Sequence, residues 1–202
     1  MKVVAAIPVP YDPTVIDLEV LYRITHQEGL PDDVEVDWVY VKGHDIGIER
    51  NELVRKCLEQ GADKIWFIDS DVLVPKDALA RLLNPEADVV MGFVPIRNTK
   101  TGSSAIYLPG TSFLKDNRIK MAHLDKLSTR TEVKGGGFGC VLRSASVFSR
   151  IDTPWFVYYE SENGVRRGED LGFCYKLEAE GIQVYADKRV RCGHRRSGYQ
   201  YE

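Results

Sequence analysis

Apolar and polar positions form a repeating pattern along the first half of the chain. Apolar runs at 2–7, 65–68 and 87–91, with an alternating run at 34–41, predict four strands. Apolar residues at helical spacing predict helices after Asp12, at 48–60 and at 75–83. The first two are expected to bury Val15, Leu18, Leu21 and Ile24, and Leu53, Val54, Cys57 and Leu58, respectively. This order predicts an α/β fold with a doubly wound, mostly parallel sheet.

The pattern changes after residue 93. Residues 94–134 lack a regular repeat and predict hairpins and a loop, so a smaller antiparallel element is expected in the C-terminal half. The later elements are expected to be a glycine-rich loop at 135–139 leading into a strand, a short helix at 144–151, an aromatic strand at 155–159, a helix at 168–181 and a strand at 182–185. We find no linker or repeat, so 1–202 is predicted to be one domain.

The apolar run at 65–68 is followed directly by Asp69, Ser70 and Asp71. No polar residue interrupts the run, which predicts a central strand covered on both faces. Ligands of open α/β sheets bind outside the carboxyl ends of the strands. On an extended chain Asp69 and Asp71 point the same way, so both can reach one cation, or one cation and one sugar hydroxyl. Oxygen ligands of this kind suit Mg²⁺ or Mn²⁺.

Composition and charge argue against a nucleic-acid-binding protein and against a membrane-spanning one. The formal net charge of −3 over 202 residues gives no sign of a nucleic-acid binder. No apolar run approaches the ~20 residues of a membrane span, and the N-terminus does not resemble a signal peptide. The four cysteines are widely spaced without a CxxC pair, which favours reduced thiols and a cytoplasmic location.

Other segments carry candidate chemistry. Arg50 and Asn51 fall in the first turn of a predicted helix, where an arginine either extends into solvent or has an anionic partner. The loop around Gly136 is either a tight turn or a ligand-facing loop. Two further features are Glu169-Asp170 at a helix start and His194 near the end. The basic residues of the C-terminal stretch could add positive charge near a bound phosphate: Lys188, Arg189, Arg191, Arg195 and Arg196.

The Asp69-Ser70-Asp71 triplet after a central strand, the Glu169-Asp170 pair about a hundred residues later and the late His194 together resemble the GT-A glycosyltransferases, particularly family-2-like inverting enzymes. The resemblance implies a nucleotide-sugar-binding half at 1–92 and an acceptor-binding half at 93–202. It implies that Asp71, with Asp69 and His194, holds Mn²⁺ or Mg²⁺. It also implies that a UDP- or GDP-linked sugar is bound by these residues: Pro8, Val9, Pro10, Arg50, Asn51, Asp69, Ser70 and Asp71.

The same resemblance implies that Asp170, or Glu169 in its place, is the catalytic base. Gly136, Gly137 and Phe138 would contact the acceptor, which could be a glycan, a lipid-linked sugar or a protein. His194 is followed by Arg-Arg-Ser-Gly, which does not match the motif of retaining glycogenin-like enzymes, so an inverting hexosyltransferase is expected. An ionised carboxylate in the first turn of a helix suits a base, because the helix dipole stabilises its charge.

Two alternatives stay open. Four apolar residues before Asp69 and Asp71 also resemble the first motif of haloacid-dehalogenase-like phosphatases, in which the first aspartate attacks phosphorus. That motif normally lies on the first strand, whereas two strand–helix units are predicted before Asp69. The second alternative is a catalytically silent module that binds a nucleotide sugar.

Overall fold

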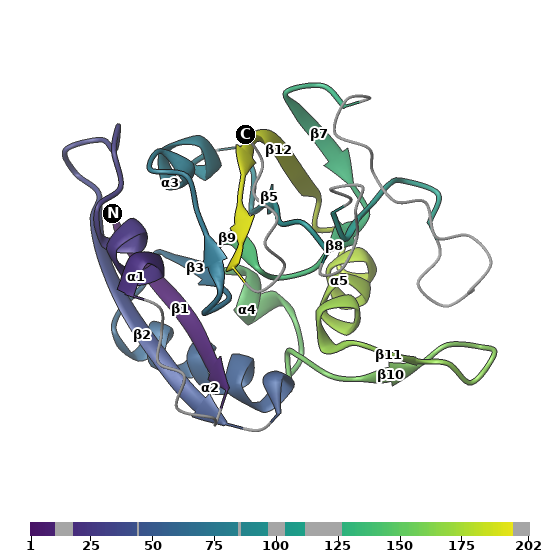
Figure 1. Cartoon of the computed structure of the whole chain (residues 1–202). Coiled ribbons are helices and arrows are strands. Elements are labelled where there is room, and N and C mark those ends of the chain that lie inside the picture. Colours follow the sequence, from purple (N-terminus) through teal and green to yellow (C-terminus); the bar gives the residue numbers. More distant parts are fainter. Residues whose placement is uncertain (11–17, 44, 85, 97–103, 112–126, 196–202) are drawn as a thin grey trace.

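A computed structural model describes residues 1–10, 18–43, 45–84, 86–96, 104–111 and 127–195 (Figure 1). Its centre is a seven-stranded sheet. In spatial order the strands are β2 (Glu35–Gly43), β1 (Lys2–Pro10), β3 (Lys64–Ile68), β9 (Cys140–Ser144), β5 (Val89–Phe93), β12 (Val184–Arg191) and β7 (Arg130–Val133). The first strand therefore continues past the expected end at Ile7, through Pro8 and Val9 to Pro10.

The sheet is mixed but largely parallel, as predicted. β1 runs parallel to β2 and β3, and β5 runs parallel to β12. The antiparallel members are β9, which lies between β3 and β5, and the edge strand β7 beside β12. The five strands that share one direction place their carboxyl ends at one edge of the sheet, where ligands of such sheets bind.

Helices cover both faces of the sheet (Figure 1). On one face, α2 (Ile46–Glu59), α4 (Val147–Arg150) and α5 (Glu169–Ala179) pack on an apolar cluster that includes Ile65 and Phe67. On the other, α1 (Leu18–Thr25) and α3 (Ala78–Leu82) pack on a cluster that includes Trp66 and Ile68. Both faces of β3 are thus covered, as its uninterrupted apolar run predicts.

Three short antiparallel pairs stand outside the main sheet. They are β4 (Val72–Leu73) with β13 (Gly193–His194), β6 (Ile106–Tyr107) with β8 (Gly135–Gly136), and β10 (Tyr159–Glu160) with β11 (Arg166–Arg167). The first pair matters most for a site, because it aligns His194 with Val72, directly after the acidic triplet.

Some expected details are wrong. Leu18 was expected to face the core, but it is 78% exposed, and Val20 and Ile24 form the buried side of α1. Leu58 of α2 is likewise exposed. The expected strand at 155–159 is irregular except at its last residue, because Trp155 and Phe156 pack into the core from a loop. Val15 lies outside the described residues.

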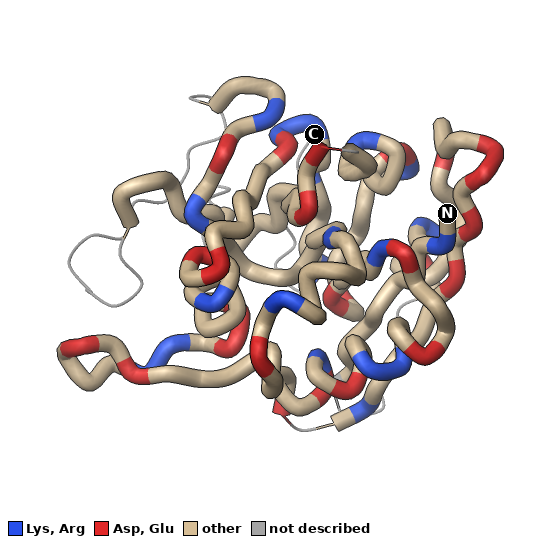
Figure 2. The backbone as a smooth tube through the Cα atoms, turned by 180° about the vertical axis from the view of Figure 1, so that it is seen from behind, with Lys and Arg blue, Asp and Glu red and all other residues tan. Residues whose placement is uncertain are grey.

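The expectation of unpaired cysteines is met. All four cysteines are free and buried. Among the described residues, no helix combines the length and the apolar character needed to cross a membrane. Figure 2 shows basic and acidic residues interspersed along the described backbone, in keeping with the small net charge.

Candidate functional site

The acidic triplet lies where β3 ends. The backbone N–H of Val72 donates to the carbonyl of Asp69 at 3.0 Å, which turns the chain between β3 and β4. The N–H of Asp69 donates to the carbonyl of Gly139 at 3.2 Å. A Cβ at Gly139 would lie 3.3 Å from an Asp69 carboxylate oxygen, so the absence of a side chain there gives this carboxylate room. The glycine loop and the triplet thus pack together.

Arg50 joins three elements at this point. Asp45 caps α2 by accepting from the N–H of Ile48, which places Arg50 one turn inside the helix. Its side chain is buried, donates to Asp69 Oδ1 at 2.9 Å and forms a second ion pair with Glu169. Burial acts to lower the pKa of Arg50, but the carboxylates of Asp69 and Glu169 outweigh it and raise the pKa. The sequence left open whether Arg50 extends into solvent or has an anionic partner. The structure gives it two such partners, Asp69 and Glu169.

Glu169 and Asp170 occupy the first turn of α5. Glu169 is buried against Arg50, whereas Asp170 is half-buried and accepts from the N–H of Leu171 at 2.7 Å. Burial raises the pKa of both carboxyls, and the charge of Arg50 opposes that rise. A raised pKa makes a carboxylate a stronger base. Gly168 is required here, because a Cβ would lie 2.6 Å from an Asp170 oxygen.

His194 lies beside Asp71, with 3.3 Å between Nε2 and Oδ2. Its Nδ1 lies 2.9 Å from the carbonyl oxygen of Pro95, which only accepts, so Nδ1 carries a proton. In a neutral imidazole, Nε2 then presents its lone pair to the Asp71 carboxylate. That approach is favourable when a proton or a cation lies between the two groups, and the pair therefore fits two ligands of a divalent ion. Among the described residues no group of three or more His, Cys, Asp or Glu forms a metal cluster.

A cavity of about 380 Å³ is lined by half of the predicted site residues. Such a volume suits a small-molecule ligand. Its wall includes parts of two chain segments, 92–96 and 104–105. The predicted site residues on the wall are Arg50, Asp69, Gly137, Phe138, Glu169, Asp170 and His194. Predicted site residues from five separate stretches of the sequence thus meet in one hollow, where carboxylates, a cation and an imidazole lie close together.

Other predicted residues lie apart from this cavity. Pro8 and Val9 are buried in β1, and the side chain of Pro10 is outside the described atoms. Ser70 is half-buried after β3. Asn51 is buried and binds backbone: its amide nitrogen donates to the carbonyls of Gly47 and Phe156, and its oxygen accepts from the N–H of Phe156. These hydrogen bonds give Asn51 a structural role.

The glycine loop divides between structure and cavity. Gly136 pairs with Ile106 in the β6–β8 ladder, and a Cβ there would lie 2.5 Å from the carbonyl oxygen of Ala105. Gly137 faces the cavity, with room for a Cβ 3.7 Å from Asp170. Phe138 lines the wall while most of its ring is buried. Gly136 thus serves close packing, Gly137 and Phe138 face the cavity, and ligand contact by this loop stays a prediction.

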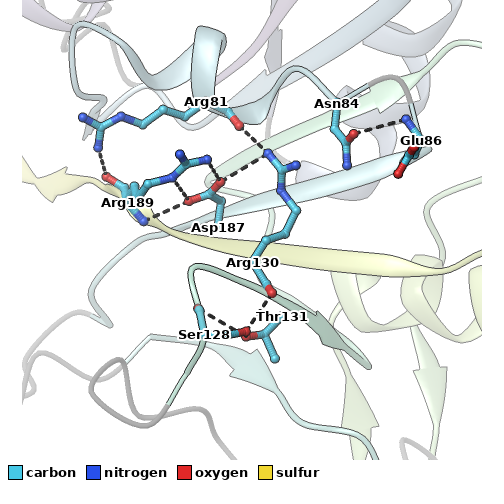
Figure 3. Close-up of polar contacts among 8 residues, drawn as sticks. All are labelled: Arg81, Asn84, Glu86, Ser128, Arg130, Thr131, Asp187 and Arg189. Atoms are coloured by element: carbon cyan, nitrogen blue, oxygen red, sulfur yellow. Dashed lines mark hydrogen bonds and ion pairs between the residues drawn. The ribbon is translucent and has the colours of Figure 1, made fainter.

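The basic stretch near the end is used for local contacts. Asp187 is fully buried and accepts from Arg189 and Arg130 (Figure 3). Arg81 completes this cluster, donating to the Arg189 carbonyl and accepting from Arg130. Lys188 donates to the Leu127 carbonyl, Arg191 to that of Lys188, and Arg195 pairs with Glu19. Arg196 lies outside the described residues. These contacts hold α3, β7 and β12 together and do not line the cavity.

Besides Asp187, two buried charged residues were missed by the sequence analysis. Arg143 is fully buried in β9, and none of its guanidinium nitrogens has a hydrogen-bond partner within the described ranges. Its charge instead faces aromatic rings, with 4.3 Å to the Phe138 centroid and 4.2 Å to that of Phe173. Burial lowers the pKa of Arg143. The one available signal was a lone arginine in the apolar run at 140–144.

The second missed residue is Glu49, buried in the first turn of α2. Burial raises the pKa of its carboxyl to about 7; the charge of Arg50 opposes the rise, and Asp45 and Asp69 add to it. A Cβ at Gly43 would lie 2.9 Å from the Glu49 side chain, so this glycine at the end of β2 makes room for the carboxyl. Nothing in the sequence distinguished Glu49 from an ordinary charged residue at a helix start.

No protein-family model and no curated protein matches the chain in sequence. Solved structures do match in fold. A197 from STIV is 19% identical with a TM-score of 0.65, over 96% of this chain and 85% of that one. GalNAc-T7, solved with UDP, GalNAc and Mn²⁺, is 12% identical with a TM-score of 0.64 over 98% of this chain. TarS of S. aureus is 16% identical with a TM-score of 0.53 over 93% of this chain.

This chain spans 45% of the matched GalNAc-T7 chain and 36% of the TarS chain, so it corresponds to one part of each. The likeness to all three covers nearly the whole length of the present chain. The chain has the GT-A glycosyltransferase fold.

Proposed function

We propose that this protein is a metal-dependent glycosyltransferase that moves one sugar from a nucleotide-sugar donor to an acceptor hydroxyl with inversion. The observation that carries the proposal is the meeting of Asp69, Arg50, Asp170 and His194 on one cavity at the carboxyl ends of the parallel strands. The GT-A fold supports it, because GalNAc-T7, which matches this chain in fold, was solved with UDP, GalNAc and Mn²⁺.

Asp71 and His194 would hold the divalent cation, and phosphate oxygens would complete its shell. When bound, Mn²⁺ or Mg²⁺ supplies positive charge beside the departing diphosphate. Since the GalNAc-T7 structure holds UDP and Mn²⁺, a UDP-linked sugar with Mn²⁺ is the first donor to examine, with GDP-linked sugars next. Asp69, held in place by Arg50, would accept hydrogen bonds from sugar or ribose hydroxyls.

Asp170 is the better candidate for the base. The charge of Glu169 is balanced by its ion pair with Arg50, whereas Asp170 faces the cavity without an ion pair among the described contacts. Its carboxylate would take the proton of the acceptor hydroxyl as the new oxygen–carbon bond forms. In the same step the bond between the sugar and the diphosphate breaks, and the diphosphate leaves with the electron pair. A single base acting on the face opposite the leaving group gives inversion.

The donor site is tested by thermal unfolding against UDP-, GDP-, CMP- and dTDP-sugars, each with and without Mn²⁺. A ligand at about a hundred times its dissociation constant stabilises the fold by ~2.7 kcal/mol. We expect a shift with one nucleotide that requires Mn²⁺ and is absent in Asp71→Ala. The matched control is Asp32→Ala, an exposed loop aspartate, which should retain the shift.

Sugar release and transfer are then measured with that nucleotide. Asp170→Asn should bind the donor and lose turnover, because the amide is not a base. Binding without release in the unaltered protein would instead identify a silent nucleotide-sugar module. Absence of a shift with every donor would contradict the proposal and direct attention to phosphorylated substrates.

A further inference from the structure

Arg143 is a buried charge close to the candidate site that the proposed chemistry does not use. It is fully buried in β9, and none of its guanidinium nitrogens has a hydrogen-bond partner in the described part of the chain. Burying an ion without a partner is strongly unfavourable for folding. Proteins retain such unfavourable groups mainly where a site needs them. The surroundings of Arg143 therefore bear on the cavity.

Five phenylalanine rings surround the Arg143 guanidinium. Their centroids lie 4.2 to 5.5 Å from its Cζ, and the rings belong to Phe67, Phe138, Phe148, Phe156 and Phe173. Two of these rings also lie near Arg50, with 5.5 Å from its Cζ to the Phe138 centroid and 5.9 Å to that of Phe156. A cation is attracted to the face of an aromatic ring within about 6 Å. The two arginines therefore share two rings.

The shared rings offer Arg50 an alternative to its ion pairs. Its two terminal nitrogens pair with Asp69 and Glu169, while its Nε is buried without a hydrogen-bond partner among the described residues. The Asp69 side chain is 35% exposed, so water competes with Arg50 for that carboxylate. A guanidinium that leaves a carboxylate stays in an attractive environment if it moves onto the rings of Phe138 and Phe156.

The charge of Arg143 opposes this movement. Its Cζ lies 4.3 Å from the Phe138 centroid, closer than that of Arg50 at 5.5 Å. Burial lowers the pKa of Arg143, and the like charge of Arg50 lowers it further, which shows that the two cations repel each other. Repulsion between charges in an apolar core is screened less than in water. Arg143 thus makes the rings less favourable for Arg50.

We propose that Arg143 is a positioning residue for the candidate site. It occupies the rings of Phe138 and Phe156, and it thereby keeps the Arg50 guanidinium on the carboxylates of the cavity. This action on Arg50 does not depend on the proposed function. The further step, in which Asp69 held by Arg50 binds hydroxyls of a donor, rests on the proposed function.

Nitrogen-15 NMR of arginine-labelled protein observes the Arg50 guanidinium directly. The two ion pairs should restrain rotation about the bond between Nε and Cζ, so this rotation is slow in the unaltered protein. Arg143→Met removes the charge and fills similar space. We expect Arg50 to rotate about tenfold faster in this variant. Arg50→Lys, which lacks the signal, assigns it.

Two further variants separate positioning from packing. Phe148→Leu removes a ring that lies 5.2 Å from Cζ of Arg143 and is not shared with Arg50 among the described contacts. It should leave the rotation of Arg50 unchanged. Phe156→Leu combined with Arg143→Met removes one of the shared rings, and it should restore part of the slow rotation. Thermal unfolding of each variant checks that it is folded.

Donor binding gives a second measurement. In Arg143→Met the affinity that underlies the Mn²⁺-dependent donor shift should fall by about tenfold, although the fold itself becomes more stable. A residue that only fills space would not change stability and affinity in opposite directions. Absence of the donor shift in the unaltered protein would contradict the proposed function alone, because the NMR measurement is made without donor.

The inference is overturned if Arg50 rotates at the same rate in Arg143→Met as in the unaltered protein. It is also overturned if Phe148→Leu accelerates the rotation as much as Arg143→Met does, since packing of the aromatic rings would then be the cause. Faster rotation that is confined to Arg143→Met and is partly reversed by Phe156→Leu supports it.

Discussion

At the scale of single residues, Arg143 is the least expected feature of the core. Its guanidinium is fully buried and makes no described hydrogen bond, so its desolvation is offset only by the surrounding aromatic rings. Cation–π contacts contribute about 2 kcal/mol when desolvated, less than the several kcal/mol lost on burying an ion. Arg143 should therefore reduce the stability of the fold.

We predict that Arg143→Met raises the free energy of unfolding by about 1–3 kcal/mol, because methionine fills similar space without a charge. Arg143→Ala should instead lower it, because the small side chain leaves a cavity. Urea unfolding of both variants measures the difference. A methionine variant less stable than the unaltered protein would show that the aromatic contacts outweigh desolvation.

Glu49 gives a prediction for pH. Its pKa of about 7 in the folded protein exceeds its ordinary value of 4.5, so the folded state holds a proton that the unfolded state has released between those pH values. Stability from this group is therefore present below about pH 4.5 and falls as pH rises to about 7. Replacing Glu49 by a residue that does not titrate should remove this dependence of stability on pH.

Relative to the unaltered protein, we expect the free energy of unfolding of Glu49→Gln to rise by ~1–2 kcal/mol when the pH is raised from 5 to 7.5. Urea unfolding at both pH values tests it. Glu52→Gln, one turn further along α2 and partly exposed, is the matched control and should show no such gain. An equal change in both variants would mean that Glu49 titrates normally.

At the scale of elements, α2 holds the candidate site in place through two neighbouring residues, Arg50 and Asn51. Arg50 reaches β3 and α5, while Asn51 ties the helix to the loop that contains Phe156. Phe156 packs on Phe138 with ring centroids 5.3 Å apart, and Phe138 lines the cavity. Asn51 therefore acts on the cavity wall through packing and hydrogen bonds, without facing the cavity.

Asn51→Ala should lower the free energy of unfolding by about 2–3 kcal/mol, because it leaves the N–H and carbonyl of Phe156 unsatisfied in the core. Asn51→Asp should be at least as harmful, since the oxygen that replaces the amide nitrogen would face the carbonyl oxygens of Gly47 and Phe156. Arg55→Ala, on the exposed side of the same helix, should change stability by less than ~0.5 kcal/mol. A small effect of Asn51→Ala would indicate that the loop at 155–158 rearranges.

The sequence was most informative where one pattern has one physical meaning. An apolar run followed by Asp69-Ser70-Asp71 predicted a central strand covered on both faces, and the structure agrees. The sequence was least informative about which strands lie next to each other in the sheet. The apolar residues at 140–142 fit a parallel or an antiparallel strand equally well, so the place of β9 between β3 and β5 could not be predicted. Arg50 could not be placed either, because its partners come from β3 and α5.

At the scale of the whole molecule, the position of β9 decides how the two predicted halves are related. The division at 92 and 93 places β3 and β5 in the first half and β9 in the second. Because β9 is hydrogen-bonded to both, each half completes the sheet of the other. We therefore predict that the described core unfolds as one cooperative unit rather than as two.

The four cysteines can test this without any substitution. Cys57 and Cys174 belong to one apolar cluster, and Cys140 and Cys192 to the other. All are buried, and burial raises the pKa of Cys57 and Cys174 to about 12, so none should react with a thiol reagent in the folded state. Pulse labelling across a urea series, read by peptide mass spectrometry, gives an opening free energy for each. Equal values at all four cysteines would support a single unit. If Cys57 opened more easily than Cys174 by more than about 1 kcal/mol, the first half would be a separately unfolding unit despite the shared sheet.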